Sequence, residues 1–197
     1  MKKRNETMKG RVLALTLALT ANLWGGDLGK SATDAVNFCP AGLAFGVVAV
    51  NYEHLFARGH GLMARYDYEE VPEEYTDADI KASARAYFLN YRWHLEETME
   101  GCFVGVYGRH RVYDGSGRLD GERFDFRISE QTLGVNAGKR WVWENGLNLN
   151  LAFGYGGITV DRDRPADGGI RAAIADFEGE YGKINPFYGE FSVGYTF

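Results

Sequence analysis

The last eleven residues, Phe187 to Phe197, read FYGEFSVGYTF and carry the pattern that decides the fold. Apolar or aromatic side chains occupy every second position except Gly189, whereas the residues between them are mostly polar or small. Because side chains alternate across a strand, this segment has one apolar face and one polar face. The apolar face would line the core of a soluble β-sandwich or contact the lipid around a transmembrane barrel. Choosing between the two requires the rest of the chain.

The alternation ends at the terminal residue, Phe197. A terminal aromatic residue with apolar residues at alternate positions before it resembles the C-terminal signal by which bacterial outer-membrane barrels are recognised for assembly. The resemblance places this assembly signal at Phe191, Val193, Tyr195 and Phe197. It implies the barrel assembly machinery and outer-membrane lipid as partners.

The composition favours a β protein and excludes some functions. The 197 residues include 26 Gly, 12 Tyr and 12 Phe, and aromatic residues suit pleated surfaces. A formal charge of -5 argues against nucleic acid as a partner, since phosphate binding requires a basic surface. The mean hydropathy of -0.32 argues against a bundle of transmembrane helices but is compatible with strands that alternate between apolar and polar residues.

The N-terminus predicts export. Five basic residues lie among the first eleven, and the apolar run from Val12 to Trp24 is too short to span a bilayer as a helix. We therefore expect residues 1–25 to be a signal peptide and residues 26–197 to form an outer-membrane barrel domain. Cleavage after Ala21 or near Gly25 fits the pattern equally well.

Alternating segments separated by turn residues predict eight strands. Short turns alternate with longer polar connections at 71–79, 114–122 and 161–186, which is the asymmetry of bacterial barrels. Trp93, Trp141 and Trp143 lie beside the short turns, and Tyr66, Tyr68 and Tyr155 lie nearer the long connections, as two interfacial girdles require. The expected strands are Val36 to Leu43, Gly46 to Phe56, Gly61 to Glu70, Ile80 to Leu95, Cys102 to Tyr113, Arg123 to Trp143, Leu147 to Gly156, and Phe187 to Phe197.

The sixth of these strands changes phase. Phe124, Phe126 and Ile128 share one parity, whereas Leu133 and Val135 share the other. A β-bulge between Ser129 and Gln131 would place all of them on one face. The strand then leads into Asn145-Gly146, a strong hairpin signal in which a primed turn is expected.

The predicted fold is an all-β, eight-stranded antiparallel transmembrane β-barrel of the Gram-negative cell outer membrane. The chain resembles the small outer-membrane barrels of the OmpA transmembrane-domain, OmpX and OmpW type. The segments NFCPAGLAFG at 37–46, VNYEHL at 50–55 and GKRWVWENG at 138–146 are similar to a family of uncharacterised bacterial barrels of this size. The resemblance implies a fold and a location, and it transfers no catalytic residue.

An eight-stranded barrel has an interior that side chains fill. The inward parity of the strands carries charges of both signs, and such charges are tolerated only when paired. We expect a lumen plugged by paired charges, with a structural or surface-interaction role; a narrow porin-like solute channel is the alternative. The predicted lumen charge network consists of Glu53, Arg65, Asp67, Glu69, Arg92, Arg109, Arg111, Arg140 and Glu190.

A lipid A-modifying enzyme is a further alternative, because some small barrels acylate or deacylate this lipid. A histidine–serine hydrolase needs its base within reach of the hydroxyl. None of the four histidines has a serine two residues away on the same strand face, and no Gly-x-Ser-x-Gly motif occurs. We therefore expect no enzymatic activity, no catalytic residue, no metal and no cofactor.

Two smaller features complete the prediction. Cys39 and Cys102 lie far apart in the sequence, in expected strands, and we interpret them as small buried residues rather than a disulfide. The connection at 161–186 is expected to lie outside the cell, with a short helix around Ile170 to Phe177. Its apolar residues would form an exposed apolar face that binds an extracellular partner, or the loop would simply be solvated.

Overall fold

The computed structural model describes residues 32–71, 78–163, 165–181 and 186–197. The expected signal peptide, residues 1–25, lies outside the described residues. The elements are β1 (Asp34–Phe38), η2 (Pro40–Phe45), β2 (Val47–Ala57), β3 (His60–Val71), β4 (Lys81–His94), β5 (Gly101–Leu119), β6 (Glu122–Val142), β7 (Leu147–Arg162), α2 (Gly168–Tyr181) and β8 (Phe187–Thr196).

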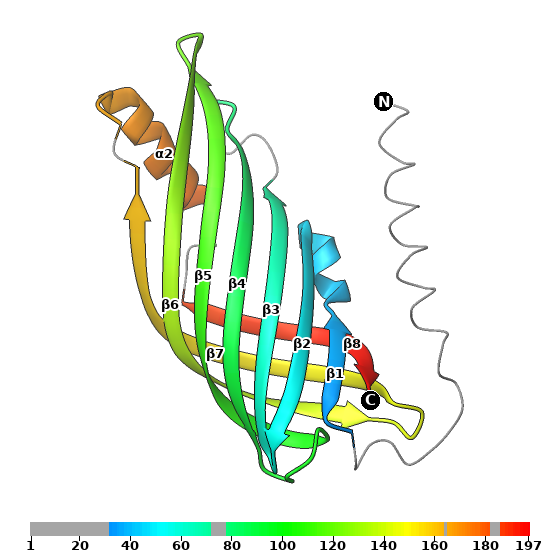
Figure 1. The fold of residues 1–197 in the computed structure, drawn as a ribbon. Coiled ribbons are helices and arrows are strands. Elements are labelled where there is room, and N and C mark those ends of the chain that lie inside the picture. Colours follow the sequence, from blue (N-terminus) through cyan, green and yellow to red (C-terminus); the bar gives the residue numbers. More distant parts are fainter. Residues whose placement is uncertain (1–31, 72–77, 164, 182–185) are drawn as a thin grey trace, which may run out of the picture.

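The eight strands form a closed antiparallel barrel in which each strand pairs with its neighbours in the sequence (Figure 1). The ring closes where β1 pairs with β8, from Ala35 opposite Thr196 to Phe38 opposite Val193. Backbone hydrogen bonds at 3.0 and 2.8 Å join Asp34 and Phe197 at this junction. The predicted fold class is confirmed.

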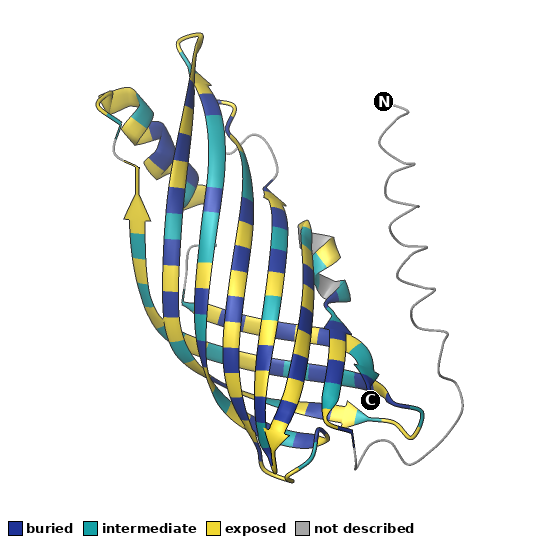
Figure 2. Ribbon diagram, viewed as in Figure 1, coloured by how far each residue is buried: buried dark blue, intermediate teal, exposed yellow. Residues whose placement is uncertain are grey.

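The two faces of the wall differ as the alternation predicted. Along each strand, buried and exposed residues alternate in stripes (Figure 2). The exposed positions carry large apolar side chains that a protein in water would bury, such as Leu133, which is 75% exposed, and Val135, which is 62% exposed. The assembly-signal residues Phe191, Val193 and Phe197 share this outward face. An apolar exterior around a closed ring of strands is the surface that faces lipid.

The predicted bulge in the sixth strand is wrong. β6 pairs with β5 from Glu122 to Arg140 and with β7 from Ile128 to Val142 without a shift of register. Phe124, Phe126 and Ile128 are buried inside the barrel, whereas Leu133 faces outward. Along this one regular strand, the apolar side chains change from the outward face at Leu133 to the inward face at Ile128. The pattern looked like a phase slip because the inward side changes from polar to apolar near the outer end.

Three other local predictions need correction. The connection expected at 114–122 is largely strand, because β5 extends to Leu119 and β6 begins at Glu122. The first strand ends at Phe38, and a 3-10 helix starting at Pro40 replaces its expected second half. The Asn-Gly hairpin is present, but only Gly146 takes a positive φ, of 82°, so the turn is not of the primed type.

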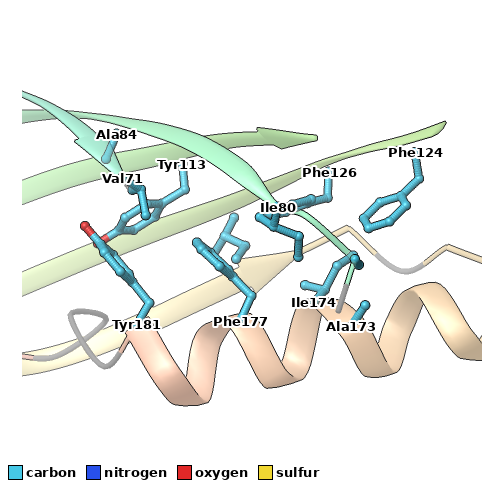
Figure 3. Close-up of a cluster of buried hydrophobic side chains, with 12 residues drawn as sticks. Val71, Ile80, Ala84, Tyr113, Phe124, Phe126, Ala173, Ile174, Phe177 and Tyr181 are labelled. Atoms are coloured by element: carbon cyan, nitrogen blue, oxygen red, sulfur yellow. The ribbon is translucent and has the colours of Figure 1, made fainter. Parts of the chain in front are cut away.

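Helix α2 lies across the outer end of the barrel and packs on it. The expected helix is present and longer than predicted. Its apolar side chains Ala173, Ile174, Phe177 and Tyr181 point toward the strands and join a cluster with inward residues of β3 to β6 (Figure 3). The prediction of an exposed apolar face on this segment is therefore wrong, because the barrel itself covers that face.

The two cysteines are free, as expected. Cys39 is buried immediately before η2 rather than within a strand, and Cys102 lies on the outward parity of β5. Among the described residues, no helix is long and apolar enough to cross a membrane.

Candidate functional site in the barrel lumen

The inner half of the lumen is organised around Glu53 of β2. Its Oε2 accepts hydrogen bonds from Arg92 Nη1 at 2.8 Å and Arg140 Nη2 at 2.6 Å, and its Oε1 lies 2.7 Å from His94 Nε2. All four side chains are fully buried. The two arginines come from β4 and β6, so the carboxylate links three sections of the wall.

A second carboxylate, Glu190 of β8, extends this network. Arg92 donates from Nη2 to Glu190 Oε2 at 2.6 Å and so bridges the two carboxylates. The other oxygen of Glu190 accepts bonds from Asn51 at 2.9 Å, Asn150 at 2.6 Å and Ser192 at 2.9 Å. Buried ions are stable only when such bonds replace lost water. The network therefore ties β2, β4, β7 and β8 together across the lumen.

Aromatic rings form the next layer toward the outside. Tyr188 contacts Phe88 with ring centroids 5.9 Å apart and Tyr107 at 4.9 Å, and its hydroxyl donates to Glu190. Phe103 lies on the inner side of Arg92, opposite His94 in the strand register, and extends the aromatic cluster past the Glu53 group; the Arg92 guanidinium is 4.4 Å from its ring centroid. These rings, with Ala86 and Ala152, form one buried cluster that fills the middle of the lumen.

Above the aromatic layer lies a second group of charges. Arg65 holds Asp67 through two bonds, from Nε at 2.6 Å and from Nη2 at 2.8 Å, which is the strong bidentate geometry. Arg109 pairs with Glu130 and donates to Thr132 at 2.9 Å. Arg111 donates to the Tyr113 hydroxyl at 3.0 Å.

The structure places all nine residues of the predicted charge network inside the barrel, in two separate groups. Glu53, Arg92, Arg140 and Glu190 form the inner group, and Arg65, Asp67, Glu69, Arg109 and Arg111 lie in the outer group. Sequence reasoning omitted Glu130, which is fully buried beside Arg109. The wrong bulge at Ser129 to Gln131 hid this residue, since uninterrupted alternation from Arg140 would have pointed it inward. With Glu130, the described lumen contains five guanidinium groups and five carboxylates.

The outermost layer is the apolar cluster beneath α2. Burial raises the pKa of the Tyr181 hydroxyl well above its ordinary value of 10.0, and the neighbouring Glu69 carboxylate, with which it shares a hydrogen bond, acts in the same direction. The hydroxyl is therefore neutral at physiological pH. Tyr181 joins the apolar layer to the charged layer below it.

Three of the histidines contact a carboxylate or a tyrosine hydroxyl. His94 contacts Glu53, His54 Nδ1 lies 2.9 Å from Asp34, and His60 Nδ1 lies 2.6 Å from the Tyr91 hydroxyl. His110 lies on the outward face of β5, opposite Tyr87 and Gln131. Within the described part of the chain, no group of three or more potential metal ligands occurs.

A closed ring of strands, apolar outside and charged inside, defines the class of the protein. It is a transmembrane β-barrel of the outer-membrane type. Residues 29–169 match the family described as "Protein of unknown function (DUF3575)", and the chain belongs to this family. A search of curated proteins found no match.

Three solved barrels are similar in outline. The attachment invasion locus protein Ail of Yersinia pestis is 10% identical, with 84% of this chain and 99% of that chain covered and a TM-score of 0.45. CarO2 of Acinetobacter baumannii is 10% identical, with 84% of this chain and 98% of that chain covered and a TM-score of 0.39. Neisserial surface protein A, NspA, is 15% identical, with 83% of this chain and 91% of that chain covered and a TM-score of 0.37. The strand register of the chain itself carries the fold assignment.

Proposed function

We propose that this protein is a non-conducting outer-membrane barrel with a structural or surface-interaction role and no catalytic step. The observation that carries the proposal is the fully buried Glu53 network, in which one carboxylate engages Arg92, Arg140 and His94. An ion crossing the lumen would have to break these pairs or displace the aromatic layer above them. Either route costs several kcal/mol, on the order of the desolvation of a buried charge.

Conductance across planar lipid bilayers tests this proposal. The refolded mature protein should give no discrete channel steps, because the buried pairs around Glu53 and Glu190 and the aromatic layer lie across the lumen. A variant in which Tyr188→Ala and Phe88→Ala remove rings from the middle layer should conduct more than wild type, and the outward substitution Tyr87→Ala should behave like wild type. Stable single-channel steps from the wild-type protein would favour the narrow porin-like alternative.

The absence of catalysis has its own test. Expression in a bacterium of known lipid A structure should leave the lipid A mass spectrum unchanged, because three histidines contact a carboxylate or a tyrosine and His110 lies on the outward face of β5. A mass shift corresponding to a lost or gained acyl chain would support the lipid-modifying alternative.

The surface role rests on the part of the barrel that rises above the apolar belt. There the outward face of β5 and β6 carries charges, including an Arg127–Asp114 pair at 2.8 Å, and the polar side of α2 faces away from the barrel. An extracellular partner would contact this polar surface of segment 161–186 rather than its buried apolar side. Cleavage of this segment by protease on intact cells would support the topology, whereas cleavage only after permeabilisation would contradict it.

The assembly machinery is the second proposed partner. Replacing the terminal aromatic residue, Phe197→Asp, should lower the amount of heat-modifiable barrel in the outer membrane while export continues. Thr196→Ser, next to it on the lumen side, is a matched control. Equal barrel levels for both variants would contradict the assembly signal.

A further inference from the structure

The barrel wall has a seam between β8 and the start of β2. β1 is only five residues long, and its pairing with β8 stops at Phe38 opposite Val193. β8 continues outward to Phe187, paired with β7 on its other side as far as Tyr155. Over residues 187–192, no strand in the described part of the chain covers the β1-facing edge of β8.

The 3-10 helix η2, which contacts β8, and a set of side chains take the place of the missing strand. On this edge, the carbonyl oxygens of Phe187, Gly189 and Phe191 accept hydrogen bonds from Arg109 Nη1 at 3.0 Å, Arg65 Nη1 at 3.0 Å and Cys39 Sγ at 2.8 Å, respectively. Both arginines reach across from β3 and β5. The odd residues of β8 direct N–H and C=O toward β1, as Phe197 does, so the amides of Gly189 and Phe191 also point into the seam.

A cavity of about 490 Å³ passes through this seam. Its lumen side is lined by the guanidinium groups of Arg65, Arg109 and Arg111, and its lipid side by the rings of Phe153, Phe187 and Phe191. The volume falls within the roughly 300–1,000 Å³ range of ligand pockets. The cavity therefore brings buried cations and outward-facing aromatic rings together at one place in the barrel wall.

We propose that this cavity binds a single-chain amphiphile with an anionic head, such as a fatty acid, which enters sideways from the membrane. The chain would lie among the three phenylalanine rings, and the head would reach Arg65 and Arg109. Their Nη1 groups now bond to neutral carbonyls, and an anionic oxygen accepts a stronger bond than a carbonyl does. The seam amides of Gly189 and Phe191 add two further donors.

The three carboxylates that line the cavity, Asp67, Glu69 and Glu190, already have partners, which favours an anionic head over an ammonium. Both oxygens of Asp67 are held by Arg65, and Glu190 is held by Arg92 and its amide and hydroxyl neighbours. Glu69, the remaining carboxylate, shares a hydrogen bond with the Tyr181 hydroxyl. An ammonium would compete with these partners, whereas an anion displaces only neutral carbonyls.

Photo-crosslinking in vesicles tests the site with a defined probe. The mature protein is reconstituted in phosphatidylcholine vesicles and labelled with a palmitate analogue that carries a photoactivatable diazirine on its chain. Peptide mass spectrometry should locate saturable label in residues 186–191. Label spread evenly over the lipid-facing strands, without saturation, would overturn the proposal.

Two matched glycine variants separate the seam from ordinary lipid contact. A Cβ atom added at Gly189 or at Gly157 would meet no atom within 4 Å, so the two positions start from the same open surroundings. Gly189→Leu fills the outer mouth of the seam and should reduce the saturable label about tenfold, a factor that corresponds to about 1.4 kcal/mol. Gly157→Leu, on the lipid-facing side of β7 away from the seam, should leave it unchanged. Equal labelling of the two variants would contradict the site.

Competition identifies the head group. Palmitate should displace the probe at a concentration about tenfold lower than its methyl ester does, because only the acid offers an anion to the guanidinium groups. Hexadecyl phosphate distinguishes the two natural sources: weaker competition than palmitate assigns a fatty acid, and stronger competition assigns a lysophospholipid-type phosphate. Equal competition by acid and ester would exclude recognition of an anionic head.

Discussion

The two ends of the lumen use opposite means to fill the same barrel. In the inner half, fully buried charges of both signs bond around Glu53 and Glu190, while the outward face is apolar. At the outer end, the inward face carries Phe124, Phe126 and Ile128 beneath α2, while the outward face carries charges. β6 runs through both regions without a change of register.

The difference follows from the solvent around the wall. Where lipid surrounds the strands, apolar side chains gain by facing outward, and the polar residues remain inside as pairs. Where the strands rise into water, the hydrophobic effect drives apolar side chains inward, as in a soluble domain. We therefore expect the inversion of hydropathy along β6, between Leu133 and Ile128, to mark the outer boundary of the membrane.

The largest expected effect is the loss of the central carboxylate. Glu53→Ala leaves Arg92, Arg140 and His94 buried without their shared partner and should lower the free energy of unfolding by about 3 to 5 kcal/mol. Urea unfolding in phospholipid vesicles measures this. The exposed ion pair between Arg58 and Glu97, 3.7 Å apart, supplies the control: Glu97→Ala should change stability by less than about 1 kcal/mol. Similar losses for both variants would show that the inner network is not the main support of the barrel.

At the outer end, Phe177→Ala should weaken the docking of α2. The ring is fully buried against Phe126 and Tyr181, and removing it should cost about 3 to 5 kcal/mol of packing. Because the strand ladder does not include the helix, the loss should appear as faster proteolysis at Arg171 and faster amide exchange in α2. Ala175→Ser, on the exposed side of the helix, serves as the control. Global unfolding of the barrel with the same loss of stability would show that the two regions are one cooperative unit.

The boundary between the regions can be tested on the outward face of β6. Val135→Arg should destabilise the protein by about 2 to 4 kcal/mol if this position lies near the middle of the bilayer. Asp125→Arg, on the same face above the inversion, should cost little. The same unfolding assay in vesicles compares them, and equal costs would mean that the membrane boundary is misplaced.

The smallest expected effect concerns Tyr181. Its raised pKa means that the folded protein keeps the hydroxyl protonated where the unfolded chain ionises it. The contribution of Tyr181 to α2 docking should therefore be complete below a pH of about 10 and decrease as the pH rises further. Tyr181→Phe should remove this alkaline dependence and cost about 0.5 to 1.5 kcal/mol at neutral pH. Amide exchange in α2 as a function of pH measures both, and an unchanged alkaline dependence in the variant would assign it to another group.

Sequence alone determined the strand count, the facing of most residues and nine of the ten charged side chains in the lumen network. It did so because alternation has a period of two, so Glu53, Arg92 and Glu190 could be assigned to the inside before any contact was known. The same reasoning failed at Glu130. A change of solvent and an inserted residue produce the same hydropathy pattern, and only the pairing of β6 with β5 and β7 separates them.

Tertiary structure alone decided which groups meet. Alternation gives the side of the wall but not the height, so no sequence pattern could place Arg140 of β6 and His94 of β4 on the same carboxylate of β2. The spacing of its apolar residues predicted the apolar face of α2. Only the closed barrel shows that Phe177 on this face packs against inward residues of the strands and is not exposed to a partner. The seam likewise depends on where β1 stops relative to β8, which is a property of strand register. Contacts between residues distant in sequence are set by the shear and closure of the whole sheet, and these are not encoded in any one segment.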